Sequence, residues 1–399
     1  MYDAIVVGAR CAGSPTAMLL ARKGLSVLLI DKAAFPSDTI STHIIWPSGT
    51  SRLKRWGLLD RLADTGCPLN SKMTFDVGPF ALSGSHVPYQ GISDCYAPRR
   101  TVLDNMLVEA AADAGVEVRT GCSVEEVLMD DEQAVGVRCR SANGVRVDEK
   151  ARIVIGADGR NSVVAQVVGA EKYNVKPNLA CWYYAYWSGA ASDGIEFYMR
   201  PERAIGSIPT NDGLVCIAVA APFRDYEKCR SDVEASYMSS LELTPAILER
   251  TKKGKRETRF FGLGEVPNFF RKPFGPGWAL VGDAGYHKDP IGAQGISDAF
   301  RDAEILAEAI YDGFSEKRAL SHALAEYEQK RNDEVAAMYD FNCQLASLDP
   351  PPPEMQQMFG ALRGNQVQTD RFFGVLSGTV PIPEFFSPDN MRSIISGIL

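Results

Sequence analysis

The sequence predicts an α/β fold with a discontinuous Rossmann-like domain, an inserted, mainly antiparallel β-sheet domain and a helical C-terminal tail. Three observations support this prediction. Residues 4–31 follow the pattern strand, glycine-rich turn, helix, strand, which is typical of a βαβ unit. Residues 176–261 are rich in aromatic and β-branched residues and are interrupted by Gly and Pro, which favours antiparallel strands. The pattern of a short apolar run followed by a turn with Gly and Asp recurs at residues 153–159 and 278–285. The β-sheet domain is therefore inserted between two parts of the first domain.

The spacing after the first strand indicates a dinucleotide site. Apolar residues 5–7 are typical of a buried parallel strand, and Gly8 and Gly13 turn the chain into the next helix. A second apolar run ends at Asp31, 18 residues after Gly13. In this fingerprint, backbone N–H groups at the helix N-terminus meet a pyrophosphate and the acidic residue accepts a ribose hydroxyl.

Arg10 departs from the fingerprint because it stands where the second glycine usually occurs. Its Cβ crowds the approach of a phosphate, whereas its guanidinium has the chemistry to pair with a phosphate directly. The helix that follows is expected to be capped by Ser14 and to end at Gly24.

The composition is that of a globular protein and argues against several classes of partner. The chain has 399 residues, and its net charge of −8 argues against a nucleic-acid partner or an anionic membrane surface. Nine cysteines contain no C-x-x-C pair, so neither a disulfide framework nor a metal site is expected. With no signal peptide and no uninterrupted apolar run of 18 residues, we expect a cytoplasmic protein without stable membrane insertion.

Changes of pattern along the chain set the predicted domain boundaries. The first domain is discontinuous, a β-hairpin joins the β-sheet domain from a distance, and a Phe-rich tail is expected to wrap back as a cover. The ranges are 1–71, 96–175 and 262–345 for the first domain, 72–95 and 176–261 for the β-sheet domain, and 346–399 for the tail.

Two segments of the chain allow both a structural and a functional interpretation. Loop residues 32–49 combine small polar groups with apolar bulk, so they either lie beside a ligand or anchor a connector in the core. His43 in this loop is a candidate proton-transfer group. Aromatic residues alternate from Trp182 to Trp187, so half of them either pack in the core or form a wall that faces a substrate. A helical pattern is also expected through residues 53–62.

Three motifs occur in order: GARCAG near the start, GADGRNS in the middle and GDAGYHKDPIGAQGISDAFRDA near residue 290. Over residues 1–345 this combination resembles the FAD-dependent monooxygenases related to p-hydroxybenzoate hydroxylase. That family shares its fold with geranylgeranyl reductases and flavin-dependent halogenases. The resemblance implies a Rossmann-like FAD-binding domain, with FAD as the cofactor and NAD(P)H as a co-substrate.

The resemblance also assigns cofactor-binding residues. The first motif would bind the ADP half of FAD, an arginine in R-x-x-L-D would contact the flavin side, and the two later motifs would bind the ribityl and pyrophosphate region and the isoalloxazine ring. The implied set is Gly8, Arg10, Ala12, Gly13, Asp31, Lys32, Arg100, Asp158, Gly159, Gly282, Asp283, Pro290, Ala293, Gln294, Gly295 and Ile296.

Two positions differ from the family pattern. The alanine and histidine that often follow Gly-Asp-Ala are Gly285 and Tyr286 here, and the glycine expected before Gln294 is Ala293. The backbone role of the loop is kept by both changes. Tyr286 stands at the position of the family's histidine, and the nearest histidine, His287, follows it by one residue.

The family chemistry implies a hydroxylase. NAD(P)H reduces FAD, O2 adds to form a flavin C4a-hydroperoxide, and one oxygen passes to an aromatic or other electron-rich small molecule. A phenolic substrate would need a base, for which His43, His287 and Asp289 are the candidates. The quaternary state is expected to be a monomer or a homodimer.

Three other functions stay open. The first is a reductase of isoprenoid double bonds, and the second is a non-catalytic flavin sensor. The third is a halogenase, which would need a catalytic lysine beside the flavin and the segment W-x-W-x-I-P; that segment is missing from the sequence.

Overall fold

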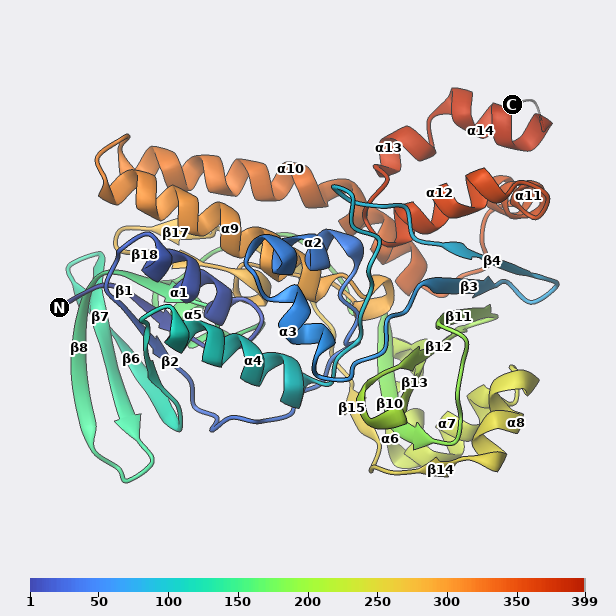
Figure 1. Cartoon of the computed structure of the whole chain (residues 1–399), viewed down its shortest axis with the longest axis horizontal. Coiled ribbons are helices and arrows are strands. Elements are labelled where there is room, and N and C mark those ends of the chain that lie inside the picture. Colours follow the sequence, from blue (N-terminus) through green and yellow to red (C-terminus); the bar gives the residue numbers. More distant parts are fainter. Residues whose placement is uncertain (398–399) are drawn as a thin grey trace.

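The computed structural model describes residues 1–397, which form two large sheets, a small sheet and the helices that cover them (Figure 1). Residues 398 and 399 of the predicted tail lie outside the described residues. The first large sheet has the strand order β17-β18-β8-β1-β2-β5, and β7 pairs with both β6 and β8. Its strands are β1 (Tyr2–Val7), β2 (Val27–Ile30), β5 (Glu117–Arg119), β6 (Cys122–Asp130), β7 (Gln133–Ser141), β8 (Arg146–Gly156), β17 (Phe274–Gly275) and β18 (Trp278–Leu280).

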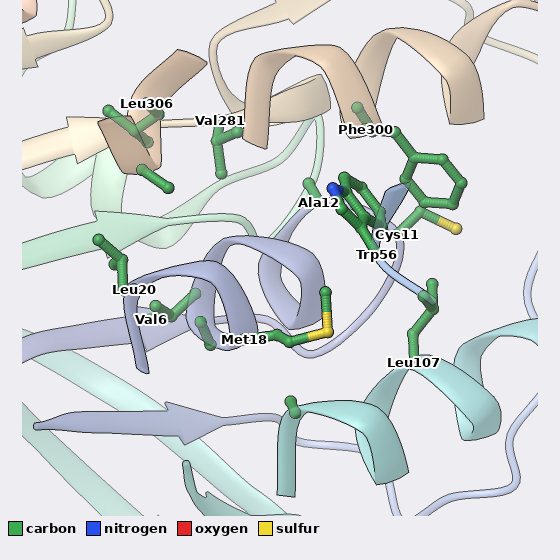
Figure 2. Packing of buried hydrophobic residues seen from close by; sticks show 14 of the residues in the cluster. Val6, Cys11, Ala12, Met18, Leu20, Trp56, Leu107, Val281, Phe300 and Leu306 are labelled. Carbon is green, nitrogen blue, oxygen red and sulfur yellow. The ribbon is translucent and has the colours of Figure 1, made fainter. Parts of the chain in front are cut away.

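The centre of the first sheet is parallel, as its apolar runs predict. β1 pairs in parallel with β2 and β8, and β8 pairs in parallel with β18. Helix α1 (Gly13–Arg22) contacts both α4 (Arg100–Asp113) and α9 (Gly295–Phe314). Met18 of α1 and Phe300 of α9 belong to one buried cluster between the sheet and these helices (Figure 2). The ends of β1, β8 and β18 therefore meet at one edge, where open α/β sheets bind ligands.

The start of α1 differs from the prediction. Ser14 does not cap the helix, which begins at Gly13; the Ser14 hydroxyl instead donates to the carbonyl oxygen of Ala9, 2.9 Å away. The predicted end at Gly24 is confirmed, because its φ of +87° is left-handed. Glycine adopts such a conformation without strain and ends a helix.

The helical pattern predicted through residues 53–62 is two helices rather than one. Helix α2 (Pro47–Arg55) ends before Gly57, whose φ is +75°, and α3 (Leu59–Ala63) follows. A left-handed residue cannot continue a right-handed helix. Gly57 therefore divides the apolar pattern between two short helices.

The second large sheet has the order β14-β10-β13-β12-β11-β3-β4, and β15 pairs with β10. The predicted hairpin is confirmed by β3 and β4, and β3 pairs in parallel with β11. The two segments assigned to the β-sheet domain thus share one sheet. Its strands are β3 (Lys72–Asp76), β4 (Ala81–Ser85), β10 (Ala180–Ser188), β11 (Ile195–Arg200), β12 (Arg203–Pro209), β13 (Val215–Pro222), β14 (Lys255–Arg256) and β15 (Phe261–Leu263).

The alternation in β10 assigns its side chains to two different environments. Tyr183 and Trp187 belong to a buried cluster with the helices that follow β13. Tyr184 and Tyr186 belong to a different cluster on the other face, which we call the inner face. The helices on the first side are α6 (Tyr226–Ser231), α7 (Val233–Leu241) and α8 (Pro245–Lys253).

The C-terminal tail packs over β3 and β4, as predicted (Figure 1). Phe75 of β3 lies 5.8 Å from Phe359 and 5.5 Å from Phe372 between ring centroids. In residues 1–397 we find no helix that combines the length and apolarity needed to span a membrane. The remaining elements are β9 (Lys172–Lys176), β16 (Asn268–Arg271), β19 (Tyr286–His287), α5 (Val163–Val167), α10 (Leu320–Ala346), α11 (Pro353–Leu362), α12 (Gln366–Leu376), α13 (Ile382–Phe385) and α14 (Pro388–Ser396).

Candidate functional site

The fingerprint turn is so tightly packed that it requires glycine twice. Gly8 has a φ of +102°, and a Cβ on Gly13 would lie 1.7 Å from the Gly8 carbonyl oxygen. The backbone N–H groups of Ala12 and Gly13 have no acceptor within residues 1–397. They lie at the N-terminus of α1, where free donors and the helix dipole attract a phosphate.

Asp31 is buried beside this turn at the end of β2. Its carboxylate accepts hydrogen bonds from the backbone N–H of Ala9 at 2.7 Å and of Ala33 at 2.8 Å. Each oxygen keeps a second lone pair that could accept a ribose hydroxyl. The adjacent Lys32 is exposed, and no described residue forms an ion pair with it.

The Arg10 guanidinium already has protein partners. Its Nη1 donates to Asp104 Oδ2 at 2.5 Å, and its Nη2 donates to the Ser37 hydroxyl at 2.8 Å. Direct pairing with a phosphate would require Arg10 to leave a buried carboxylate. Its assignment as a phosphate ligand therefore stays a prediction.

Arg100 begins α4 and is held by the same carboxylate. Arg100 Nε and Nη2 lie 3.0 and 2.9 Å from Asp104 Oδ1, and the Cys11 thiol donates to that oxygen at 3.3 Å. Asp104 is completely buried. Sequence reasoning did not assign it a role, although its i,i+4 spacing from Arg100 is a signal for such a pair.

Asp158 follows β8 and contains a buried oxygen without a partner. Its Oδ2 accepts the backbone N–H of Val163 at 2.7 Å, whereas no described residue donates to Oδ1. Burial raises the pKa of this carboxyl above its ordinary value. Ser162 caps α5 by accepting the N–H of Ala165. Gly159 has open space where a Cβ would stand, so a ligand can approach its backbone.

The third motif meets the first one directly. Gly282, in the 3-10 turn η3 (Gly282–Ala284), has a φ of +60°, and a Cβ there would lie 2.7 Å from the Ala12 Cβ. Asp283 in this turn is exposed, and no described residue donates a hydrogen bond to its carboxylate. The carboxylate interacts electrostatically with Arg100. The three motifs thus converge, and Asp283 keeps free acceptors.

His287 is buried and makes contacts with neighbouring residues of the protein. Its Nδ1 is hydrogen-bonded to the carbonyl oxygen of Pro267, and its ring stacks on Phe269 with centroids 5.8 Å apart. Burial lowers the pKa of the imidazole. His287 therefore has one ring nitrogen that is not already engaged by the backbone.

Asp289 follows β19 of the small sheet and contacts β10 of the second large sheet. Its Oδ1 accepts the Trp182 indole N–H at 3.1 Å and the backbone N–H of Ile291 at 3.0 Å. Its Oδ2 is buried and has no partner among the described residues. Burial raises the pKa of Asp289 to about 7. A carboxyl that titrates near neutrality inside a protein is a candidate acid or base.

The loop after Asp289 leads into helix α9. Pro290 begins the 3-10 turn η4 (Pro290–Gly292), and Ala293 then adopts a φ of +51°. This left-handed conformation explains why the family has glycine where Ala293 stands. Gln294 Nε2 donates to the Leu376 carbonyl oxygen at 2.9 Å. Gly295, exposed with open space at its Cβ position, begins α9, and Ile296 is buried behind it.

His43 lies beside the same loop. The next residues anchor it there, because the Trp46 indole N–H donates to the Gly292 carbonyl oxygen at 3.2 Å. His43 Nε2 is hydrogen-bonded to the Tyr186 hydroxyl at 2.5 Å, whereas its buried Nδ1 has no partner among the described residues. Burial, together with the positive charges of Arg100 and Arg99, lowers the pKa of His43 to about 3. His43 is therefore neutral, with one ring nitrogen unpaired.

The inner face of the second sheet brings aromatic and very small residues together. Opposed residues in antiparallel strands point to the same face, and the register opposes Tyr184 to Ala218, Ala218 to Gly206 and Gly206 to Phe197. Two rings thus flank a stretch of minimal side chains, which we call the small-residue row. The Tyr184 hydroxyl is buried without a partner among the described residues. The alternation of aromatic residues predicted a shared face, but the small residues beside it were missed.

These features fit FAD. Free amide donors lie at the start of α1, Asp283 has unused acceptors, a buried oxygen of Asp158 is unpaired, and Gly159 and Gly295 leave space for a ligand. The residues that would hold FAD are those of the three converging motifs. Among the described residues, no group of three or more His, Cys, Asp or Glu is arranged to hold a metal ion.

Comparisons with known proteins agree with this site. One relative is the 1H-pyrrole-2-carbonyl-[peptidyl-carrier protein] brominase of Pseudoalteromonas luteoviolacea, 24% identical, with 77% of each chain covered. Another is the digeranylgeranylglycerophospholipid reductase of Methanosarcina acetivorans, 27% identical, with 83% of this chain and 80% of the relative covered. Among solved structures, PqsL of Pseudomonas aeruginosa, "a probable FAD-dependent monooxygenase", has a TM-score of 0.72 at 20% identity, with 94% of this chain and 99% of that chain covered.

These relatives include a halogenase and a reductase as prominently as a monooxygenase, so they establish a common flavoprotein fold and leave the reaction open. A family model described as "FAD binding domain" matches residues 1–342. This protein belongs to that FAD-binding family of oxidoreductases.

Proposed function

We propose that this protein is an FAD-dependent monooxygenase that uses NAD(P)H and O2 to hydroxylate a planar, electron-rich aromatic molecule. The observation that carries the proposal is the small-residue row. Gly206 and Ala218 lie between the rings of Tyr184 and Phe197 on the inner face. Backbone and methyl groups between two rings suit an aromatic plane, which stacks on such surfaces.

The same row argues against a halogenase. Ile208 and Pro209 end β12, as in the segment W-x-W-x-I-P, but Ala204 and Gly206 stand where that segment has tryptophans. Two indoles would fill the space that the small residues leave on this face. Ile291, in the loop that would face the flavin, packs against the cluster that contains Ala204. The row therefore lies on the side of the sheet that faces the cofactor loop.

Two buried groups would handle protons beside this row. His43 is neutral and its Nδ1 is unpaired, so it would accept a hydrogen bond from a substrate hydroxyl while Nε2 stays bonded to Tyr186. Asp289, with a pKa of about 7, would take up or release a proton on the other side. Bound FAD supplies the electron transfer from NAD(P)H to O2. The protein then orients the aromatic ring and excludes water.

The first test is an anaerobic titration with NADPH and then NADH, followed at the flavin absorption band. We expect bleaching, and we expect electron-rich arenes to accelerate it and to stimulate oxygen uptake in air. Saturation of an isoprenoid substrate without oxygen uptake would instead establish the reductase. A product that forms only when halide is present would establish the halogenase.

A matched pair of variants tests the row itself. A Cβ at Gly206 would meet no atom closer than 3.7 Å, so Gly206→Ala should keep substrate-stimulated oxygen uptake. Gly206→Trp should fill the row and abolish the stimulation, while flavin content and bleaching by NAD(P)H stay unchanged. Full stimulation in Gly206→Trp would contradict the location that we propose for the substrate.

The reductase is the second candidate because one feature favours it. The inner face continues into an apolar cluster formed with the tail, which includes Phe359, Phe372 and Phe385, and such a lining also suits an isoprenoid chain. The unpaired His43 nitrogen has no obvious use with a hydrocarbon. Oxygen uptake with an arene and double-bond reduction with an isoprenoid separate the two candidates directly.

A further inference from the structure

The place of the missing fingerprint glycine is taken by an arginine that joins three separate segments. Arg10 lies in the turn after β1 and forms an ion pair with Asp104 of α4 at 2.5 Å. Its other donors bind the loop after β2, at the Ser37 hydroxyl and at the carbonyl oxygens of Ser37 and Asp38. Its guanidinium also lies 5.4 Å from the centroid of the Phe35 ring. Arg10 thus ties the loop and the helix to the fingerprint turn.

Asp104 is shared between this arginine and the one assigned to the flavin side. Its Oδ2 accepts from Arg10, and its Oδ1 accepts from Arg100 Nε. Asp104 is completely buried and Arg10 is partly buried: the side chain of Asp104 is 0% exposed, that of Arg100 10% and that of Arg10 24%. One carboxylate therefore orients two guanidinium groups, and the three side chains together carry a net charge of about +1.

We propose that Arg10 and Asp104 form a latch that controls the release of FAD, and that Asp104 is the positioning residue for Arg100. A buried, hydrogen-bonded charge pair resists opening, because breaking it leaves each charge without a partner in a poorly solvated place. The ion pair holds the turn whose free amide groups would bind the pyrophosphate of FAD. Arg10 thus retains the cofactor by holding the surrounding chain in place, rather than by contacting phosphate itself.

The test of the latch is Arg10→Gly, which restores the ordinary fingerprint. FAD release from the holoprotein is followed by the rise of flavin fluorescence after dilution into an excess of an apo-flavoprotein acceptor. We expect release to become at least about tenfold faster, since loss of one partner of a buried charge pair acts mainly on dissociation. If Arg10 only hindered the approach of phosphate, Arg10→Gly would release FAD at an unchanged or slower rate. Such a result would overturn the proposal. Melting curves of the apoprotein verify that the variant is folded.

Two further variants keep the proposal testable if Arg10→Gly does not fold. Arg10→Lys keeps the charge but replaces the two nitrogens that bind Asp104 and Ser37 with a single nitrogen, so it should give intermediate release. Ser37→Ala removes one hydrogen bond of Arg10 and leaves the ion pair, so it should accelerate release less than Arg10→Gly does. Release from Arg10→Lys as slow as from the wild type overturns the latch.

Asp104→Asn tests the positioning role through the midpoint potential of bound FAD. A looser packing of the site would not change this potential by itself. Removal of the shared negative charge leaves two positive groups near the cofactor, which favours the more negative, reduced flavin. We expect the midpoint potential of bound FAD, measured by equilibration with a redox dye, to become more positive, and release to accelerate. Faster release with an unchanged potential would show that Asp104 acts only on the packing of the site.

Discussion

Asp289 is expected to make the folding stability depend on pH near neutrality. Burial raises its pKa to about 7, whereas an aspartate in an unfolded chain ionises near about 3.9. Between these two values the folded protein keeps the proton that the unfolded chain has released. Stability is therefore greatest below the unfolded pKa, falls as the pH rises and becomes constant above the folded pKa.

The size of the effect follows from this window. Each pH unit inside it corresponds to about 1.4 kcal/mol, so the contribution of Asp289 falls by about 2.5 kcal/mol between pH 5 and pH 7. A chain of 399 residues unfolds with an entropy of about 0.8 kcal/mol per kelvin. The expected effect on the melting temperature is therefore about 3 °C.

The assay compares Asp289→Asn with the wild type, at saturating FAD, by calorimetric melting at pH 5 and pH 7. The variant does not titrate, and its amide oxygen can still accept the Trp182 indole N–H. We expect the difference in melting temperature to shift in favour of the variant by about 3 °C between the two pH values. Asp64→Asn, which removes an exposed carboxyl group, is the control. A difference that is the same at both pH values would refute the assigned role of burial.

Four further variants test the cofactor site and its frame. Gly13→Ala should abolish flavin retention, judged from flavin absorbance per protein, because its Cβ would lie 1.7 Å from the Gly8 carbonyl oxygen. Asp31→Ala should weaken FAD binding by about 1.5–3 kcal/mol in a fluorescence titration; an unchanged affinity would count against the fingerprint. Asp283→Ala should lower the FAD content of folded protein, and full occupancy would exclude its proposed role. Ser162→Ala removes the cap of α5 and should lower the free energy of unfolding by about 1 kcal/mol in urea.

The fold was predictable because its signals are local. Apolar runs, turn glycines and the alternation of β10 each act over a few residues and determine strand, helix and face. The failures have local causes too. Ser14 prefers an acceptor within the turn, at Ala9, and the left-handed Gly57 divides a helix that the apolar spacing alone presents as continuous.

The candidate site was predictable only in part, because its contacts join distant segments. The three motifs indicated where a ligand would lie, since each follows a strand at the same edge of the sheet. The bond between Trp182 and Asp289 spans 107 residues, and the one between Arg10 and Asp104 spans 94. No periodicity relates such positions, so these partners became visible only when the chain was folded.

The contact between Gln294 and Leu376 has a consequence for how this protein acquires new substrates. The family match ends at residue 342, yet α12 of the later tail binds the residue that precedes α9 and covers the inner face with phenylalanine rings. A segment outside the matched FAD-binding residues thus covers the face where we propose that the substrate binds. Exchange of the tail between homologues is therefore expected to change which molecule binds beside the inner face while FAD binding is retained.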